Sequence, residues 1–354
     1  MQEDPTKART VGIWIIAVVA ICVALFFARE ILSPIAFAFL FSVVLRPPVR
    51  WLENLRVPTW IGASIVTLAA IGLLVLVIFL LSTPLQRWMD QAPKSISAAE
   101  QKLGRIRNRF EKVSEVASRL EHAAQGPTSG PAAQAPAPPQ PTSGGLMQRF
   151  FGGTTRAISG IVEVLLLLLL LLATGDLFYQ KLLKVLPFRE DKRIAITAVT
   201  EVQNVVRRYL LVTAIINLGQ GTLVTLVFWW LKMPSPILWG VFTFVLEFIP
   251  YLGAALMILM ISLVAFATFD GIGPILAAPA AYLVITTLQN NVVSPIAYGN
   301  KLKLNPVAVL IGVMIWWFLW GIPGAFLAVP IIATIKIIAD RTQGLNALGE
   351  FLGE

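Results

Sequence analysis

Long apolar runs recur along this chain, and they restrict what it can fold into more than any other feature. A helix needs about 20 mostly apolar residues to cross a bilayer, where every backbone polar group must be paired internally. Candidate runs lie at residues 11–28, 31–45, 60–81, 155–174, 210–231, 235–269, 272–290 and 306–339. These eight hydrophobic segments predict an all-α polytopic membrane protein with about six transmembrane helices and two re-entrant or broken helical hairpins.

The composition argues against an ordinary soluble domain. Hydrophobic residues make up 57% of the 354 residues and charged residues only 13%, whereas soluble domains carry about 25% charged residues. The formal net charge is +9, but the basic residues lie mainly between the apolar runs. In that position they favour anionic lipid headgroups as partners, and we predict no binding to nucleic acid.

Catalytic and metal-dependent functions have little basis in the residue content. The chain has one cysteine, Cys22, and one histidine, His122, whereas zinc sites and Ser-His-Asp sites usually need more such groups. The sequence also lacks a G-x-x-x-x-G-K-[ST] phosphate-binding loop. We therefore predict no catalytic residue, no metal and no cofactor, and a gradient-driven or facilitative transporter instead of an enzyme.

Basic residues next to the apolar runs indicate the orientation in the membrane. Lys7 and Arg9 precede the first run, which we interpret as a retained transmembrane helix because a second apolar run follows almost at once. The loop after the second run and the segment after the fourth run are also basic, with Arg46, Arg50, Arg56, Lys181, Lys184, Arg189, Lys192, Arg193, Arg207 and Arg208. These charges predict an inner or plasma membrane protein with both termini in the cytoplasm.

The chain divides into three predicted regions: a three-span region at 1–82, an extramembrane insert at 83–150 and a transport region at 151–354. Within the insert, residues 86–122 carry an apolar stripe at helical spacing, typical of an amphipathic helix. This stripe packs either within its own hairpin or in an oligomer contact. Residues 125–145 are rich in Gly, Pro, Ala, Ser and Thr, which predicts a flexible linker. Residues 188–209 predict a second amphipathic helix, lying on the membrane surface before it turns into the next span.

Two of the apolar runs are interrupted in the middle by proline and glycine. Residues 236–268 contain Pro250 and Gly253, and residues 306–334 repeat this plan with Gly321, Pro323 and Gly324. Both runs begin with proline, so they form a weak internal repeat. Broken helices at corresponding positions indicate a transporter site, because their freed backbone groups can meet a solute or an ion. We predict re-entrant hairpins, with two kinked spans as the alternative; hairpins place Lys301 and Lys303 in the cytoplasm.

Polar residues inside the apolar runs are the candidate transport residues. Glu247 precedes the first break, and a charged carboxylate at the bilayer centre costs roughly 2.5–3.5 kcal/mol on insertion scales. Glu247 therefore either handles a proton, cation or substrate, or is held by local hydrogen bonds near the hairpin tip. Asn217 and Gln220 share one helix face. A further group ends another run, with Gln289, Asn290, Asn291 and Ser294. These amides either contact the solute or join helices by hydrogen bonds.

The C-terminal half resembles the autoinducer-2 exporter family of bacterial membrane proteins. The resemblance rests on Glu247-Phe248-Ile249-Pro250-Tyr251-Leu252-Gly253, on Ser294-Pro295-Ile296 with Gly299, on Leu304-Asn305-Pro306, and on Gly321-Ile322-Pro323-Gly324 leading to Pro330. The N-terminal half is similar in plan only.

This resemblance implies a secondary transporter that forms a homo-oligomer. It suggests export of a small polar solute such as autoinducer-2 or a related metabolite, with sodium or other cation/proton antiport as the alternative. It also adds Pro295 and Asn305 to the candidate residues. A membrane scaffold protein without transport activity is the remaining hypothesis.

Overall fold

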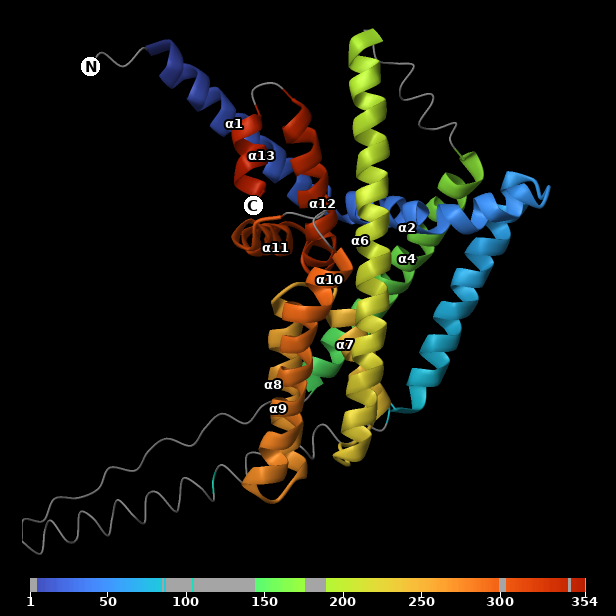
Figure 1. The fold of residues 1–354 in the computed structure, drawn as a ribbon, viewed down its shortest axis with the longest axis vertical. Coiled ribbons are helices and arrows are strands. Elements are labelled where there is room, and N and C mark those ends of the chain that lie inside the picture. The colour runs from blue at the N-terminus through green and yellow to red at the C-terminus, as the bar shows by residue number, and fades with distance from the viewer. Residues whose placement is uncertain are drawn as a thin grey trace, which may run out of the picture.

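The structure is a computed structural model that describes residues 5–84, 144–175, 189–298, 304–342 and 345–353, with the single positions 86 and 104. Regular secondary structure in these ranges is entirely helical (Figure 1). Five of the described helices are long and apolar enough to cross a membrane. These findings confirm the predicted all-α polytopic membrane fold. The insert stripe, most of the linker, Lys301 and Lys303 lie outside the described residues.

The N-terminal part consists of long helices. Their bounds are α1 (Pro5–Phe27), α2 (Arg29–Asn54), an unlabelled helix (Thr59–Pro84), α4 (Gly144–Thr174) and α6 (Arg189–Trp230). Shorter helices follow, namely α7 (Pro236–Leu246), α8 (Leu252–Thr268), α9 (Ile272–Leu288), η1 (Gln289–Val293), α10 (Ser294–Tyr298), α11 (Pro306–Trp320), α12 (Ile322–Arg341) and α13 (Asn346–Leu352).

Helix α6 corrects the prediction of a surface helix that turns into a separate span. It is one continuous helix of 42 residues, which corresponds to about 63 Å at 1.5 Å per residue. The segment before Gly219 contains no glycine or proline, so nothing in the backbone stops the helix where its polarity changes. Figure 1 shows α6 running the length of the molecule, so its amphipathic first half extends the same rod that carries the apolar second half.

Helix α2 corrects the predicted end of the second run at residue 45 and the predicted loop containing Arg46 and Arg50. It runs from Arg29 to Asn54 with three prolines inside it. Packed neighbouring helices and local adjustments can satisfy the carbonyl groups that proline frees, so a membrane helix tolerates proline better than an isolated helix does. Pro47 and Pro48 therefore do not end the helix at residue 45.

Both interrupted runs divide into two helices at the predicted places. Helix α7 ends at Leu246 and α8 begins at Leu252, while α11 and α12 are separated by Gly321 alone, whose φ is 67°. A Cβ on Gly253 would overlap the Leu246 carbonyl oxygen, and one on Gly324 would overlap that of Trp316. Glycine at these two positions is what lets each second helix start so close to the end of the first.

Two apolar cores lie along α6. The core around its first half includes Val206 and Leu210 with residues of α11 and α12. The core around its second half includes Val224 and Phe228 with residues of α7, α8 and α9. A third, smaller core joins α2, α4 and the helix Thr59–Pro84. Helix α6 is therefore the shared element of the two larger helical bodies.

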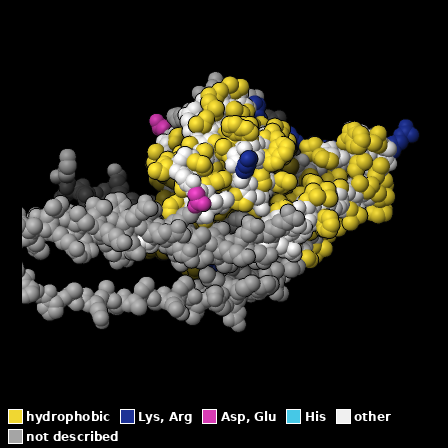
Figure 2. Space-filling model, turned by 90° about the horizontal axis from the view of Figure 1, so that it is seen from below, with side chains coloured by type: hydrophobic (Ala, Val, Ile, Leu, Met, Phe, Trp, Pro, Cys, Tyr) yellow, Lys and Arg dark blue, Asp and Glu magenta, His cyan; other side chains and the backbone are white. Residues whose placement is uncertain are grey.

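The surface is unusually apolar for a folded chain. Figure 2 shows hydrophobic side chains covering most of the described part of one face. Large apolar side chains on the helix Thr59–Pro84 are more than half exposed, for example Leu73 at 62% and Phe79 at 73%. Exposed apolar area on this scale matches a lipid environment and not water.

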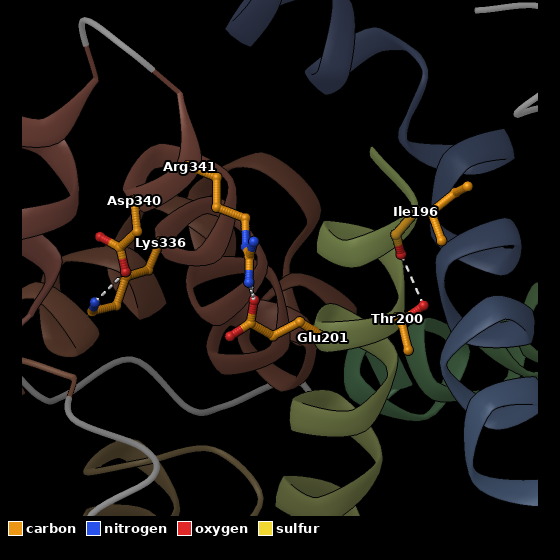
Figure 3. A network of polar contacts seen from close by, with 6 residues as sticks. All are labelled: Ile196, Thr200, Glu201, Lys336, Asp340 and Arg341. Atoms are coloured by element: carbon orange, nitrogen blue, oxygen red, sulfur yellow. Dashed lines mark hydrogen bonds and ion pairs between the residues drawn. The ribbon is translucent and has the colours of Figure 1, made fainter. Parts of the chain in front are cut away.

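Charged contacts lie at one end of α6. Arg341, the last residue of α12, forms an ion pair with Glu201 near the start of α6, and its Nε lies 2.8 Å from the Glu201 carboxylate (Figure 3). Lys336 pairs with Asp340 one turn apart on α12, at 2.6 Å. The Arg341–Glu201 pair joins α12 to the polar part of α6, and water or headgroups can solvate both pairs there.

Whether the interrupted runs re-enter or cross the membrane can be tested at Lys301. If both runs are hairpins, a cysteine at Lys301 will react with membrane-impermeant maleimide only from the cytoplasmic side. The measurement uses Cys22→Ser as the background, in inverted and right-side-out vesicles. Labelling from the outside would instead show that the first run crosses fully.

Candidate transport site

Three buried polar side chains occupy one face of α6 between the two larger cores. Thr213, Asn217 and Gln220 follow one another by four and three positions, so they share a face. Their exposed fractions are 4%, 1% and 5%. The same face is apolar before them, at Val206, and after them, at Val224. Helix α6 thus places these three buried polar side chains at the junction of the two larger apolar cores.

Glu247 reaches this junction from the end of α7. It is the C-cap residue of α7, and the break that follows directs the chain into α8. Its Oε1 accepts a hydrogen bond from the Tyr282 hydroxyl at 2.6 Å and another from Gln220 Nε2 at 3.2 Å. Tyr282 belongs to α9 and is fully buried. Among the described contacts, the Glu247 side chain is therefore bound by two other helices, α6 and α9.

The two α6 amides extend the contacts to neighbouring helices. Gln220 Nε2 also donates to Thr286 Oγ1 on α9 at 3.0 Å, and Asn217 Nδ2 donates to the Phe244 carbonyl on α7 at 3.3 Å. With its nitrogen facing the carboxylate, the Gln220 amide has the electrostatically favourable orientation. Both donors to Glu247 are neutral, so the carboxylate is stabilised here by hydrogen bonds and not by an ion pair.

The two breaks meet beside this cluster through an aromatic contact. Phe248, next to Glu247, stacks on Phe326 of α12 with ring centroids 4.9 Å apart, and Phe326 contacts Phe37 of α2 at 5.6 Å. Ile249 of the first break also packs in the core that contains Trp320 and Ala325 of the second. The interrupted runs therefore converge on one region, as broken helices do around transporter sites.

Comparison with known proteins identifies the family. A family model described as AI-2E family transporter matches residues 15–344. The chain belongs to the AI-2E transporter family. Its membership confirms the resemblance seen in the motifs and makes the chain a membrane transporter.

Individual relatives of this AI-2E transporter are similar at low identity. "AI-2 transport protein TqsA" of Escherichia coli is 24% identical over 336 residues, covering 93% of this chain and 91% of that protein. A protein of Borreliella burgdorferi named "Putative transport protein" is 26% identical over 196 residues, covering 55% of this chain and 54% of that protein. "Putative transport protein YhhT" of Escherichia coli is 26% identical over 148 residues, 42% of each chain. The matches to the last two proteins thus span about half of their length.

The other predicted residues of the AI-2E transporter fall into different places. Gln289 is half-buried and its Nε2 donates to Ser294 Oγ at 2.9 Å. Asn290 and Asn291 are exposed, and Asn291 bonds to the Thr287 carbonyl of its own helix. Of these three amide side chains, only Gln289 is turned inward.

The remaining predicted residues shape the backbone. Pro250 lies in the α7–α8 turn and Pro323 in the first turn of α12, where a missing N–H costs least. Asn305 is the N-cap of α11, and its side chain accepts from Val307 N at 2.9 Å. Pro295 lies in α10 and is exposed. None of these four has a hydrogen bond to the Glu247 cluster among the contacts described.

Tyr282 and Thr286 belong to the cluster although sequence reasoning missed them. They are four positions apart in a mostly apolar run, a spacing that puts both on one helix face. That spacing was the available signal. The part of the chain that the structure describes contains no group of three or more His, Cys, Asp or Glu side chains placed to hold a metal ion.

Proposed function

We propose that this AI-2E transporter is a secondary transporter that exports a small polar solute such as autoinducer-2 (AI-2) or a related metabolite. The observation that carries the proposal is the buried cluster of Glu247, Gln220, Tyr282 and Thr286 between two apolar cores. Buried polar groups are expensive in a membrane protein and usually mark a solute or ion pathway. The full-length similarity to "AI-2 transport protein TqsA" supports AI-2 as the first solute to test.

The cluster has the chemistry that a polar, uncharged solute needs. Hydroxyl and amide groups can exchange their mutual hydrogen bonds for bonds to a solute at little net cost, because each hydrogen bond is replaced by a similar one. The nearby breaks at residues 247–251 and at Gly321 interrupt the helices where the two bodies meet. Relative movement of these bodies would then expose the cluster to one side at a time, as alternating access requires.

Cation/proton antiport is the second candidate, and one observation favours it. Glu247 is the only acidic side chain in this buried cluster, and it has no basic partner there. A carboxylate in that situation can alternate between a proton and a cation as the two bodies move. In an exporter, the same residue would couple solute movement to the proton gradient.

Purified protein in proteoliposomes separates these functions. We expect AI-2 counterflow that is saturable and stimulated by an imposed proton gradient. Sodium-dependent proton release without AI-2 movement would favour the antiporter. A membrane scaffold would show neither activity.

Several features of the proposal come from the sequence. We infer that the protein lies in the bacterial inner membrane with both termini cytoplasmic, binds anionic headgroups through its basic residues, and forms a homo-oligomer. Blue native electrophoresis after lipid-preserving extraction would test the last of these, with a single monomeric band contradicting it.

A further inference from the structure

A π-helical turn sets the direction of the end of the α9–η1–α10 helix. The helix is continuous from Ile272 to Tyr298 and contains the π-helix Gln289–Val293, and we call it the α9–η1–α10 rod. Tyr298 follows Thr286 by twelve positions, which in a regular α-helix would rotate it by about 120° from the Thr286 face. The extra residue absorbed by one π-turn reduces the difference to about 20°. The π-turn therefore aligns Tyr298 with Thr286, toward α6.

The aligned Tyr298 makes a second polar contact on the same face of α6. Its hydroxyl lies 2.7 Å from Thr213 Oγ1, and Thr213 itself donates to the Tyr209 carbonyl. The Thr213 proton is thus used, so Tyr298 is the donor in this pair. The rings of Tyr209 and Tyr298 are also stacked, with centroids 6.0 Å apart. Two contacts, Tyr298 to Thr213 and Thr286 to Gln220, therefore join α6 to the α9–η1–α10 rod. We call these four side chains the seam, together with Gln289, which lies between Thr286 and Tyr298 along the rod.

Two acceptors in this seam lack a hydrogen-bond partner among the described residues. Both protons of Gln220 Nε2 are used, toward Glu247 and Thr286, and Gln220 Oε1 is buried without a donor. The Gln289 Oε1 is likewise buried and has no donor among the described residues, while its Nε2 donates to Ser294. Buried carbonyl oxygens are normally paired. Two such oxygens in one seam point to a ligand that donates hydrogen bonds.

We propose that this seam is a binding site for an uncharged, hydroxyl-bearing solute, and that Thr213 and Tyr298 form its second end, away from Glu247. This inference rests on the proposed function. The solute hydroxyls donate to the Gln220 and Gln289 oxygens, while Tyr298 offers a hydroxyl and a ring face at the far end. The named side chains are hydroxyls and amides, and the adjoining charge is that of Glu247. An anionic solute is repelled by that carboxylate and finds no cation among these groups to replace its water.

Two substitutions and one matched control test the second end. Tyr298→Phe removes the donating hydroxyl but keeps the ring, and Thr213→Val removes its partner. Thr222→Val is the control, because Thr222 is exposed on the same helix and makes the same bond to its own backbone, at Leu218. The AI-2 concentration for half-maximal counterflow should rise about three- to tenfold in each seam variant, the cost of one neutral hydrogen bond, and stay unchanged in the control.

The outcomes distinguish this site from the function on which it rests. Wild-type protein that transports no AI-2 overturns the proposed function and the site with it. Active wild type with unchanged half-maximal concentration in both seam variants overturns the site alone, and a lower melting temperature in those variants would then assign the seam to helix packing. Xylitol should also inhibit AI-2 counterflow at about tenfold lower concentration than xylonate. Equal inhibition by the two would overturn the preference for an uncharged solute.

Discussion

Glu247→Gln is expected to yield a well-folded protein whose gradient-driven transport falls by at least about tenfold, with a flattened dependence on pH. Glutamine keeps the shape of the side chain and an oxygen that can accept from the Tyr282 hydroxyl, but it removes the titratable group. The loss follows from removing the group that would carry the proton, and weaker neutral hydrogen bonds in place of those to a charged acceptor, which contribute about 1.5–3 kcal/mol, add to it. The measurement is AI-2 transport in proteoliposomes with and without an imposed proton gradient, across a pH series.

Glu247→Ala should be worse, because it also damages the fold. The substitution leaves the Tyr282 hydroxyl without its acceptor and removes one of two partners of Gln220, and a buried unpaired donor costs about 1–3 kcal/mol. We expect a lower melting temperature in addition to lost transport. Glu163→Gln is the control for charge alone, because Glu163 is an exposed carboxylate on α4. Normal coupled transport by Glu247→Gln would exclude a protonation role and leave the amides Gln220 and Gln289 as the functional groups.

The helices were predictable wherever local chemistry decides the structure. Apolar runs of sufficient length must be helical in a membrane, and both breaks occur where proline and glycine cluster, at residues 250–253 and 321–324. The prediction of a separate surface helix before residue 210 was wrong. A change from polar to apolar side chains changes what surrounds a helix, but it does not interrupt the backbone hydrogen bonds that continue the helix. The predicted loop after residue 45 was wrong for a related reason, since packing can compensate for the backbone donors that Pro47 and Pro48 lack.

The candidate site was only partly predictable because its contacts join distant segments. Glu247, Asn217 and Gln220 stand out in the sequence as polar residues in apolar surroundings. Their partners depend on which face of α9 meets α6, and no local pattern specifies that packing. The π-turn adds a second difficulty, because it changes the register after Thr286. The periodicity of a regular α-helix therefore does not predict that Tyr298 faces α6 while Asn290 and Asn291 are exposed.

The packing of α7 on α6 depends on a close approach of two backbones. A Cβ on Gly221 of α6 would overlap the carbonyl oxygen of Gly240 on α7, and a Cβ on Gly240 would overlap that of Gly221. Small residues at such contacts let membrane helices pack through their backbones. This contact lies one residue from Gln220 on α6 and two turns from Glu247 on α7, so it also sets the distance between the two side chains.

Gly221→Ala and Gly219→Ala should therefore have opposite effects although they lie two positions apart on α6. A methyl group at position 221 must push α7 away, because a backbone carbonyl cannot rotate aside, and overpacking of this kind costs about 1–3 kcal/mol. At position 219 a Cβ meets nothing within 4 Å, so alanine should stabilise the helix by about 0.5–1 kcal/mol. Thermal melting of the purified variants measures the stability change in each.

The same two variants should also differ in transport. Displacement of α7 lengthens the bond between Gln220 and Glu247, so Gly221→Ala should lose transport even below its melting temperature, while Gly219→Ala retains it. Equal stability and transport in the two variants would show that α6 and α7 do not pack through these glycines.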